Sequence, residues 1–324
     1  MKKLLVPVLA AAFAVAGAMG AYAQDKLTLQ LKWVTQAQFA GYIVAKAKGF
    51  YTEENLDITI LPGGPNVAPE QVIAGGGADI IVDWMGGAAA ARDKGVNLVN
   101  IAQPFKRSGL ELICPKENNI NTVADFKGKT LGVWFFGNEY PFFAWMNKEG
   151  LSTAEGGDVK VLQQSFDIQP MIQKQADCIS VMTYNEYGQA LDAGYGPDNL
   201  TIFNYTEMGN DLLEDGLYVM EDTLKDPAKV DAYTRFVKAS MKGWQYALDN
   251  PDEAAQIVVD SDETGAATLD HQKYMVGEVS KLVDAKDPKL DLTVYDRTIK
   301  ALLDQKILTK QPEGAYTTAV TDKL

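Results

Sequence analysis

The stretch QLKWVTQAQFAGYIVAKAKGFY, residues 30–51, contains the first unit of the fold. The apolar residues Leu29, Leu31 and Trp33 alternate as in a strand, and apolar residues return at helical spacing from Phe39 onward. This pattern predicts a strand, a turn and a helix. The turn carries glutamine and aromatic side chains that a packed core does not require. Open α/β sheets bind ligands at turns of this kind, outside the carboxyl ends of their strands.

The alternation of strand and helix continues along the chain in two sets. In the first set we predict strands at 26–33, 56–61, 78–84 and 98–103, and helices at 39–54, 69–74 and 88–94. The second set has predicted strands at 110–114, 129–134, 159–163, 178–182 and 200–204, and helices at 140–149, 170–175 and 186–193. This order predicts two α/β units with mostly parallel sheets. From residue 227 onward the spacing is helical only, and we expect these helices to pack back onto the first unit.

The N-terminus has the pattern of an export signal. Lys2 and Lys3 precede an apolar run over residues 4–19, and Ala21-Tyr22-Ala23 forms a small-x-small cleavage site. A membrane anchor is the alternative, but the run is short for a transmembrane helix. We therefore expect residues 1–23 to be a signal peptide that is cleaved after Ala23.

The charge of the chain excludes one class of partner. The formal net charge is −13, and removal of Lys2 and Lys3 lowers it to −15. Such an acidic surface repels phosphate backbones, so we expect no nucleic-acid partner. The apolar content of 47% is sufficient for packed cores.

The chain has two cysteines, Cys114 and Cys178, and one histidine, His271. The cysteines could pair in an oxidising compartment or remain buried thiols, and the sequence leaves both possibilities open. A single histidine without clustered cysteines predicts no transition-metal site and no Ser-His-Asp catalytic arrangement. We interpret His271 as a solvated helix residue, and we expect no cofactor.

Four predicted turns follow strand ends and share a composition. They begin at Trp33, Asp83, Trp134 and Thr183, and they are rich in aromatic, amide and carboxylate groups. None of the four contains Lys or Arg, which disfavours an anionic ligand. Aromatic faces offer stacking, and carboxylates accept hydrogen bonds from amines. The turns therefore predict a flat aromatic or heteroaromatic ligand with N–H donors.

The candidate ligand-binding residues come from these turns, and each has a plainer alternative. Trp33 could be a core residue, and Glu186 could simply favour the first turn of its helix. The candidates are Trp33, Gln36, Gln38, Phe39, Asp83, Trp84, Gly137, Asn138, Glu139, Tyr184 and Glu186. The glycine runs at 63–64 and 75–77 match no phosphate-binding motif and are interpreted as turns.

Four segments carry a resemblance to a known family. KWVTQAQFAGYIVAKAKGFYTEENLDITILPGG, GGGADIIVDW, ADFKGKTLGVWFFGNEY and MTYNEYGQ resemble segments of the NMT1/THI5-like periplasmic solute-binding proteins of ABC importers. The resemblance covers nearly the whole mature chain. It is nearest to binders of thiamine pyrimidine precursors, and the wider family includes riboflavin and sulfonate binders.

The resemblance implies the type II periplasmic binding fold, in which two crossover strands join two α/β lobes. Its implied divisions are 24–108 with 209–324 for one lobe and 109–208 for the other. It also implies a periplasmic monomer that binds a small molecule by hinge closure and delivers it to an ABC permease. Trp33 matches an aromatic position beside the pyrimidine ring, and Glu186 matches a carboxylate position at the aminopyrimidine edge.

One branch of the family is an enzyme, a pyrimidine synthase that consumes its own histidine together with pyridoxal phosphate. No histidine lies in the first turn of this chain, and no cysteines are clustered. We therefore expect a binding protein rather than an enzyme. Riboflavin or a sulfonate as ligand, and the synthase activity, remain the alternatives.

Overall fold

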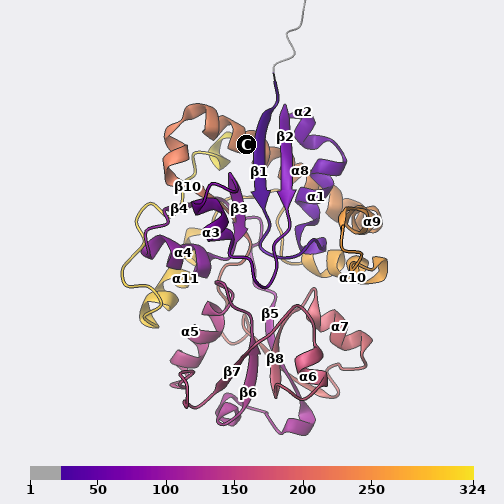
Figure 1. The fold of residues 1–324 in the computed structure, drawn as a ribbon, viewed down its shortest axis with the longest axis vertical. Helices are drawn as coiled ribbons and strands as arrows, with labels where there is room; N and C mark the ends of the chain where they lie inside the picture. Colours follow the sequence, from indigo (N-terminus) through magenta and orange to yellow (C-terminus); the bar gives the residue numbers. More distant parts are fainter. Residues whose placement is uncertain (1–22) are drawn as a thin grey trace, which may run out of the picture.

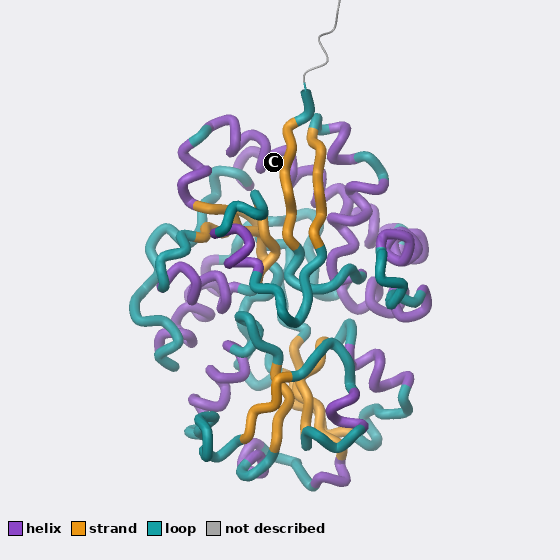
Figure 2. The backbone as a smooth tube through the Cα atoms, viewed as in Figure 1, coloured by secondary structure: helices purple, strands orange, loops and turns teal. Residues whose placement is uncertain are grey.

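The computed structural model describes residues 23–324 (Figure 1). The predicted signal peptide, residues 1–23, lies outside the described residues apart from Ala23. Two five-stranded sheets, one in each lobe, lie along the long axis of the molecule, as the backbone trace shows (Figure 2). No helix among the described residues is long and apolar enough to span a membrane.

The first sheet has the order β2-β1-β3-β10-β4. Its strands are β1 (Asp25–Gln30), β2 (Leu56–Leu61), β3 (Ile80–Asp83), β4 (Leu98–Ala102) and β10 (Gly216–Met220). Strand β1 is parallel to β2 and β3, and Leu27 lies opposite Ile58. Strand β10 enters antiparallel between β3 and β4.

The second sheet repeats this plan with the order β7-β6-β8-β5-β9. Its strands are β5 (Leu110–Pro115), β6 (Thr130–Val133), β7 (Lys160–Gln163), β8 (Cys178–Met182) and β9 (Leu200–Asn204). Strand β5 is antiparallel to β8 and β9. The chain passes from the first sheet to the second between β4 and β5, at 103–109, and returns between β9 and β10, at 205–215. The exact lobe boundaries remain a prediction.

Helices cover both sheets (Figure 1). The helices of lobe 1, the part built on the first sheet, are α1 (Ala40–Ala47), α2 (Phe50–Glu53), α3 (Pro69–Ala74), α4 (Met85–Asp93), α8 (Pro227–Asp249), α9 (Pro251–Ser261), α10 (Leu269–Val279) and α11 (Leu292–Asp304). The helices of lobe 2, the part built on the second sheet, are α5 (Tyr140–Lys148), α6 (Gln169–Ile172) and α7 (Glu186–Asp192). Short 3₁₀ helices are η1 (Ala37–Phe39), η2 (Lys116–Asn118), η3 (Val123–Phe126), η4 (Glu221–Lys225) and η5 (Thr321–Lys323).

The C-terminal helices pack on lobe 1, as the helical spacing predicts. Helix α8 lies against α1, and Trp244 contacts the backbone at Gly41 so closely that a Cβ atom there would lie 2.2 Å from the indole ring. Only glycine fits at this helix crossing without a shift of the ring. The tight packing fixes α1, and with it the turn that leads into α1 from β1.

The two cysteines form a disulfide. Cys114 in β5 and Cys178 in β8 lie on neighbouring antiparallel strands, with Cα atoms 4.2 Å apart and an S–S distance of 2.07 Å. This pairing resolves the alternative that the sequence leaves open. The bond crosslinks the central strands of the second sheet and encloses a long loop of the chain.

Candidate functional site

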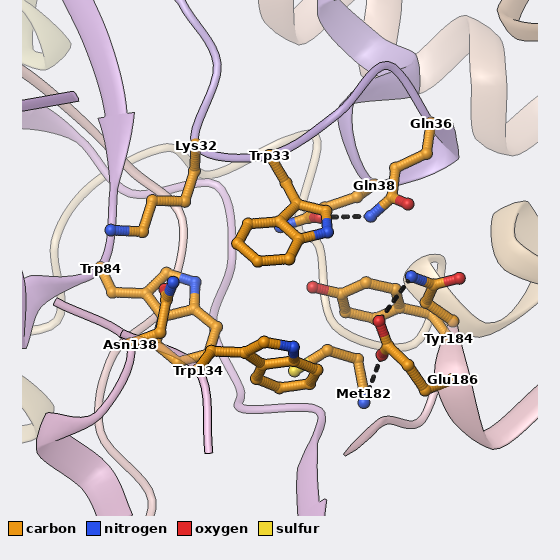
Figure 3. A pocket seen from close by; sticks show the side chains of 11 residues that line it. Lys32, Trp33, Gln36, Gln38, Trp84, Trp134, Asn138, Met182, Tyr184 and Glu186 are labelled. Atoms are coloured by element: carbon orange, nitrogen blue, oxygen red, sulfur yellow. Dashed lines mark hydrogen bonds between the residues drawn. The ribbon is translucent and has the colours of Figure 1, made fainter. Parts of the chain in front are cut away.

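A cavity lies between the two lobes, at the carboxyl ends of strands from both sheets (Figure 3). The space between its walls, including the part that opens to solvent, is about 290 Å³. The lining consists of Lys32, Trp33, Gln36, Gln38 and Trp84 from lobe 1 and of Trp134, Asn138, Met182, Tyr184, Asn185 and Glu186 from lobe 2.

The aromatic side chains surround the cavity. In Figure 3 the Trp33 ring faces Trp134 across it, with Trp84 on one side and Tyr184 on the other. The Trp33 and Trp134 ring centroids are 6.1 Å apart at an interplanar angle of 69°. Trp134 donates its indole N–H to Ser165 O at 2.7 Å, which fixes the ring. These rings offer flat apolar faces to a ligand.

Lys32 is a lining residue that the sequence analysis missed. It directly precedes the turn that begins at Trp33, so a basic residue lines the cavity although the four turns themselves contain none. Its Nζ lies 2.7 Å from Asp83 Oδ1 and donates to Phe136 O in lobe 2 at 2.9 Å. Burial opposes its charge, but the neighbouring carboxylates, chiefly Asp83, outweigh this and raise the pKa of Lys32. The ammonium therefore stays charged and is neutralised by a carboxylate of its own lobe.

Asp83 is fully buried and lies outside the cavity lining. It ends β3, and its Oδ1 also accepts from the backbone N–H of Trp84 at 2.8 Å. Burial raises the pKa of Asp83, and the Lys32 charge acts in the opposite direction. The predicted candidate is thus placed behind the wall, where it holds Lys32.

Gln36, Gln38 and Trp84 are joined by a hydrogen-bonded relay. Gln36 Nε2 donates to Gln38 Oε1 at 2.7 Å, and Gln38 Nε2 donates to Asp215 Oδ2 at 2.6 Å. Trp84 Nε1 donates to Asp215 Oδ1 at 3.0 Å. Burial raises the pKa of Asp215 to about 6, although the Gln38 bond lowers it. Phe39, the last residue of η1, is fully buried in the core instead.

The turn after β6 brings lobe 2 close to lobe 1. Phe136 and Gly137 have φ values of +60° and +92°, and a Cβ atom on Gly137 would lie 3.1 Å from Gly87 Cα. Gly137 and Glu139 do not line the cavity; Glu139 Oε2 accepts from Gly137 N at 2.8 Å and shapes the turn. Asn138 does line it, and its Nδ2 donates to Phe135 O at 2.9 Å.

Glu186 is the buried carboxylate of the cavity. Its Oε2 accepts from Met182 N at 3.0 Å, and its Oε1 accepts from Asn185 Nδ2 at 2.8 Å. Burial raises the pKa of Glu186 to about 7, against the lowering effect of these hydrogen bonds. The carboxylate keeps further lone pairs with which it can accept from a ligand.

His271 corrects another expectation. It is half-buried rather than solvated, and its Nε2 lies 2.8 Å from Asn185 Oδ1 across the cleft. Since the Asn185 amide nitrogen donates to Glu186, its oxygen must accept, and His271 donates. Tyr274 of the same helix, α10, donates to Thr183 O at 2.6 Å. Helix α10 of lobe 1 thus holds the turn that carries Glu186.

Seven of the eleven candidates lie together in the lining: Trp33, Gln36, Gln38, Trp84, Asn138, Tyr184 and Glu186. Phe39, Asp83, Gly137 and Glu139 lie behind it. Four further lining residues are absent from the candidates: Lys32, Trp134, Met182 and Asn185. Each of them either is next to a candidate in the sequence or lies in the same turn as one. In residues 23–324, no group of three or more His, Cys, Asp or Glu side chains is placed to hold a metal ion.

Comparison with known proteins gives a family and a fold. The family model described as NMT1/THI5 like matches residues 36–254. The alkanesulfonate-binding protein SsuA from Xanthomonas axonopodis pv. citri superposes with a TM-score of 0.68 at 14% identity, covering 92% of this chain and 99% of that one. At this identity the likeness shows the fold alone, and the predicted two-lobed periplasmic binding protein fold is confirmed.

Three relatives illustrate the range of functions among similar chains. A formylaminopyrimidine-binding protein from Halalkalibacterium halodurans is 24% identical over 247 residues, covering 73% of this chain and 71% of the relative. The riboflavin-binding protein RibY from Chloroflexus aurantiacus is 26% identical over 239 residues, covering 71% and 64%. A 4-amino-5-hydroxymethyl-2-methylpyrimidine phosphate synthase from Legionella pneumophila is 32% identical over 110 residues, covering 34% of each chain.

Proposed function

The chain belongs to the NMT1/THI5-like family, and from this premise we propose that it is the substrate-binding component of an ABC importer. Its ligand is a flat heteroaromatic molecule such as a hydroxymethyl- or aminomethyl-pyrimidine precursor of thiamine. The protein acts in the periplasm as a monomer and delivers the ligand to a permease of the inner membrane. The Cys114–Cys178 disulfide fits an oxidising compartment.

The observation that carries the ligand class is the pairing of aromatic faces with unengaged acceptors. Among the described residues, no group donates to Gln36 Oε1 or to Asn138 Oδ1, and Glu186 retains lone pairs. The indole donors of Trp84 and Trp134 are already used. A ligand that brings N–H donors matches this arrangement.

A small donor set also remains in the cavity. Trp33 Nε1 and the Tyr184 hydroxyl make no hydrogen bond to the described residues, and both side chains line the cavity. An aminopyrimidine carries amine donors on one edge and ring-nitrogen acceptors on the others, so it can use both sets. A sulfonate offers only acceptors, and Lys32 is already neutralised by Asp83.

The mechanism is closure of two lobes over the ligand. Three hydrogen bonds cross the cleft: from Lys32 to Phe136, from Tyr274 to Thr183 and from His271 to Asn185. A ligand that contacts both walls stabilises the arrangement in which these bonds form, and so shifts the equilibrium toward the closed form. Only recognition is required of the residues that line the cavity, and none of them acts in a chemical step.

The riboflavin alternative differs in ligand size. A tricyclic ring with a ribityl chain is much larger than a single pyrimidine ring and would need a wider separation of the two walls. The synthase alternative requires pyridoxal phosphate on a lysine, and the only lysine in the lining, Lys32, is held as an ammonium by Asp83. Neither alternative has an observation that favours it over the aminopyrimidine.

A thermal-shift screen of residues 24–324 tests the proposal. The panel contains hydroxymethyl- and aminomethyl-pyrimidines, thiamine, riboflavin, taurine and pyridoxal phosphate. A ligand at about 100 times its Kd adds about 2.7 kcal/mol to the free energy of unfolding. Stabilisation by the pyrimidines supports the proposal. Stabilisation by riboflavin or taurine alone would retain the transport role but reject the ligand class, and a pyridoxal phosphate adduct would favour the enzyme.

A further inference from the structure

Asp215 stands behind the cavity wall, at the end of the segment that returns to lobe 1 and directly before β10. It is fully buried, and it does not line the cavity. Its two oxygens are divided between two lining side chains: Oδ1 accepts from Trp84 Nε1 and Oδ2 accepts from Gln38 Nε2. Apart from the field of its charge, Asp215 can therefore influence a ligand through the side chains that it holds.

The chemistry of these partners fixes the direction of every bond in the relay. An ionised carboxylate only accepts, so Gln38 must turn its nitrogen toward Asp215. The Gln38 oxygen then faces Gln36, so Gln36 must turn its nitrogen toward Gln38. The structure has this direction, with Gln36 Nε2 donating to Gln38 Oε1 at 2.7 Å. At the end of the relay, Gln36 Oε1 receives no hydrogen bond from any residue in 23–324.

We propose that Asp215 is a specificity-determining positioning residue, whose negative charge orients the Gln38 and Gln36 amides so that Gln36 presents a carbonyl oxygen to the cavity. The proposal rests on the proposed function and deepens it, because it names the residue that makes this wall select ligands with N–H donors. Asp215 does not contact the ligand itself. It determines whether the oxygen or the nitrogen of the Gln36 amide contacts the ligand.

The Asp215→Asn variant should reverse the relay. Trp84 can only donate, so the new carboxamide must keep its oxygen toward the indole and turn its nitrogen toward Gln38. Gln38 then rotates its amide to accept, and its nitrogen faces Gln36. Gln36 must accept in turn and presents its NH₂ group to the cavity. One substitution of nearly equal size would thus convert an acceptor in the wall into a donor.

A nearby carboxyl provides the matched control. Glu214 is also buried, but it accepts from Ser108 Oγ and from Gly109 N, and it has no bond to the relay. Glu214→Gln makes the same carboxyl-to-amide replacement one residue away without reaching Gln38, and both variants are compared at pH 9, above the pKa values of about 8 for Glu214 and about 6 for Asp215. A difference between the two variants at this pH therefore reports the relay rather than the loss of a buried charge.

The first experiment needs no ligand. Side-chain amide NMR signals of Gln36 and Gln38 are recorded in the mature chain labelled with ¹⁵N-glutamine, for wild type, Asp215→Asn and Glu214→Gln. We expect both glutamine signals to shift in Asp215→Asn and to stay in place in Glu214→Gln. Unchanged signals in Asp215→Asn would overturn the proposal, whatever the protein binds.

The second experiment measures specificity with two pyrimidine probes, one with an exocyclic amine and one with a carbonyl at the same position. The ratio of their Kd values should change at least tenfold toward the carbonyl probe in Asp215→Asn, and less than twofold in Glu214→Gln. An unchanged ratio would overturn the proposal. If wild type binds neither probe, the proposed function fails. The NMR experiment still shows whether Asp215 orients the Gln38 and Gln36 amides.

If Asp215→Asn does not fold, variants of Gln36, at the opposite end of the hydrogen-bonded relay from Asp215, test the proposal instead. Gln36→Glu places an acceptor against the Gln38 oxygen, whereas Gln36→Met only removes the bond. We expect a lower Tm for Gln36→Glu than for Gln36→Met, since Asp215 prevents Gln38 from turning. Equal Tm values would show that Gln38 rotates freely and would contradict the proposal.

Discussion

The Lys32 ammonium lies 2.7 Å from the Asp83 carboxylate, and the side chains are 2% and 0% exposed. Both residues belong to lobe 1, but Lys32 also donates to Phe136 O of lobe 2. The pair therefore gives the cleft a cation whose charge is already balanced. This explains how a basic residue can line a cavity that we propose for an uncharged ring rather than for a sulfonate.

Removal of one partner from this pair should be costly. Asp83→Ala leaves a buried ammonium without its counter-charge, and we expect a loss of about 3–5 kcal/mol in the free energy of unfolding. Denaturant unfolding measures it. The double variant Lys32→Met/Asp83→Leu removes both charges and should recover most of the loss. A double variant as unstable as Asp83→Ala would show that packing, not charge, determines the effect.

The pH dependence of stability should reflect Glu186. Burial raises its pKa to about 7, whereas in the unfolded chain it is about 4.3. Between these values the folded protein keeps a proton that the unfolded chain has released, so the free energy of unfolding should fall as pH rises from about 5 to 7.

Two other buried carboxyls also make the free energy of unfolding fall as pH rises. Burial raises the pKa of Glu214 to about 8 and the pKa of Asp215 to about 6. The difference between wild type and Glu186→Gln isolates the Glu186 part. Wild type should have the steeper dependence in urea titrations between pH 5 and 7. Parallel curves for the two proteins would place the Glu186 pKa near its ordinary value.

Trp134 should contribute a stacking face. Its ring is held by the bond to Ser165 O and faces Trp33 across the cavity. Trp134→Ala should weaken binding of an aminopyrimidine by about 1–3 kcal/mol, the magnitude found for stacking of bases on aromatic side chains. Trp134→Phe keeps a ring and is the matched control. Calorimetry that gives the same Kd for Trp134→Ala and wild type would remove Trp134 from the site.

The disulfide should stabilise the second sheet. Cys114 and Cys178 are 64 positions apart. Closure of a loop of this length lowers the entropy of the unfolded chain, and this adds about 4 kcal/mol to the free energy of unfolding at 25 °C. Reductant should lower the urea midpoint of wild type and leave that of Cys114→Ala/Cys178→Ala unchanged. A wild-type midpoint that does not respond to reductant would mean that the bond is absent or contributes little.

Much of this architecture follows from local patterns in the sequence. Alternating apolar residues such as Leu27 and Leu29 mark a strand because they face a core, and the turn from Trp33 to Phe39 must then lie at a carboxyl end. The strand ends of both units are therefore predictable, and with them most of the cavity. The sequence places Trp134 at the start of a turn that follows a strand, but nothing local shows that its ring faces the cleft.

The long-range polar contacts could not be predicted in this way. Gln38 and Asp215 are 177 positions apart, and His271 and Asn185 are 86 apart. Their pairing depends on how the chain returns to lobe 1 and on how the lobes close, which no periodicity encodes. The charge of Lys32 predicts a solvated strand end, whereas the ion pair with Asp83 allows Lys32 to be buried.

Calorimetric titration with a matched pair of ligands tests the central claim most directly. One ligand is 4-amino-5-hydroxymethyl-2-methylpyrimidine, and the other is the same ring without the exocyclic amine. The titration is made at pH 8, above the Glu186 pKa of about 7, so that the carboxylate is ionised. A hydrogen bond to a charged acceptor contributes about 1.5–3 kcal/mol, so wild type should bind the amine at least about tenfold more tightly. In Glu186→Gln the two affinities should converge. Equal affinities in wild type, or binding of taurine with no binding of either pyrimidine, would contradict the account.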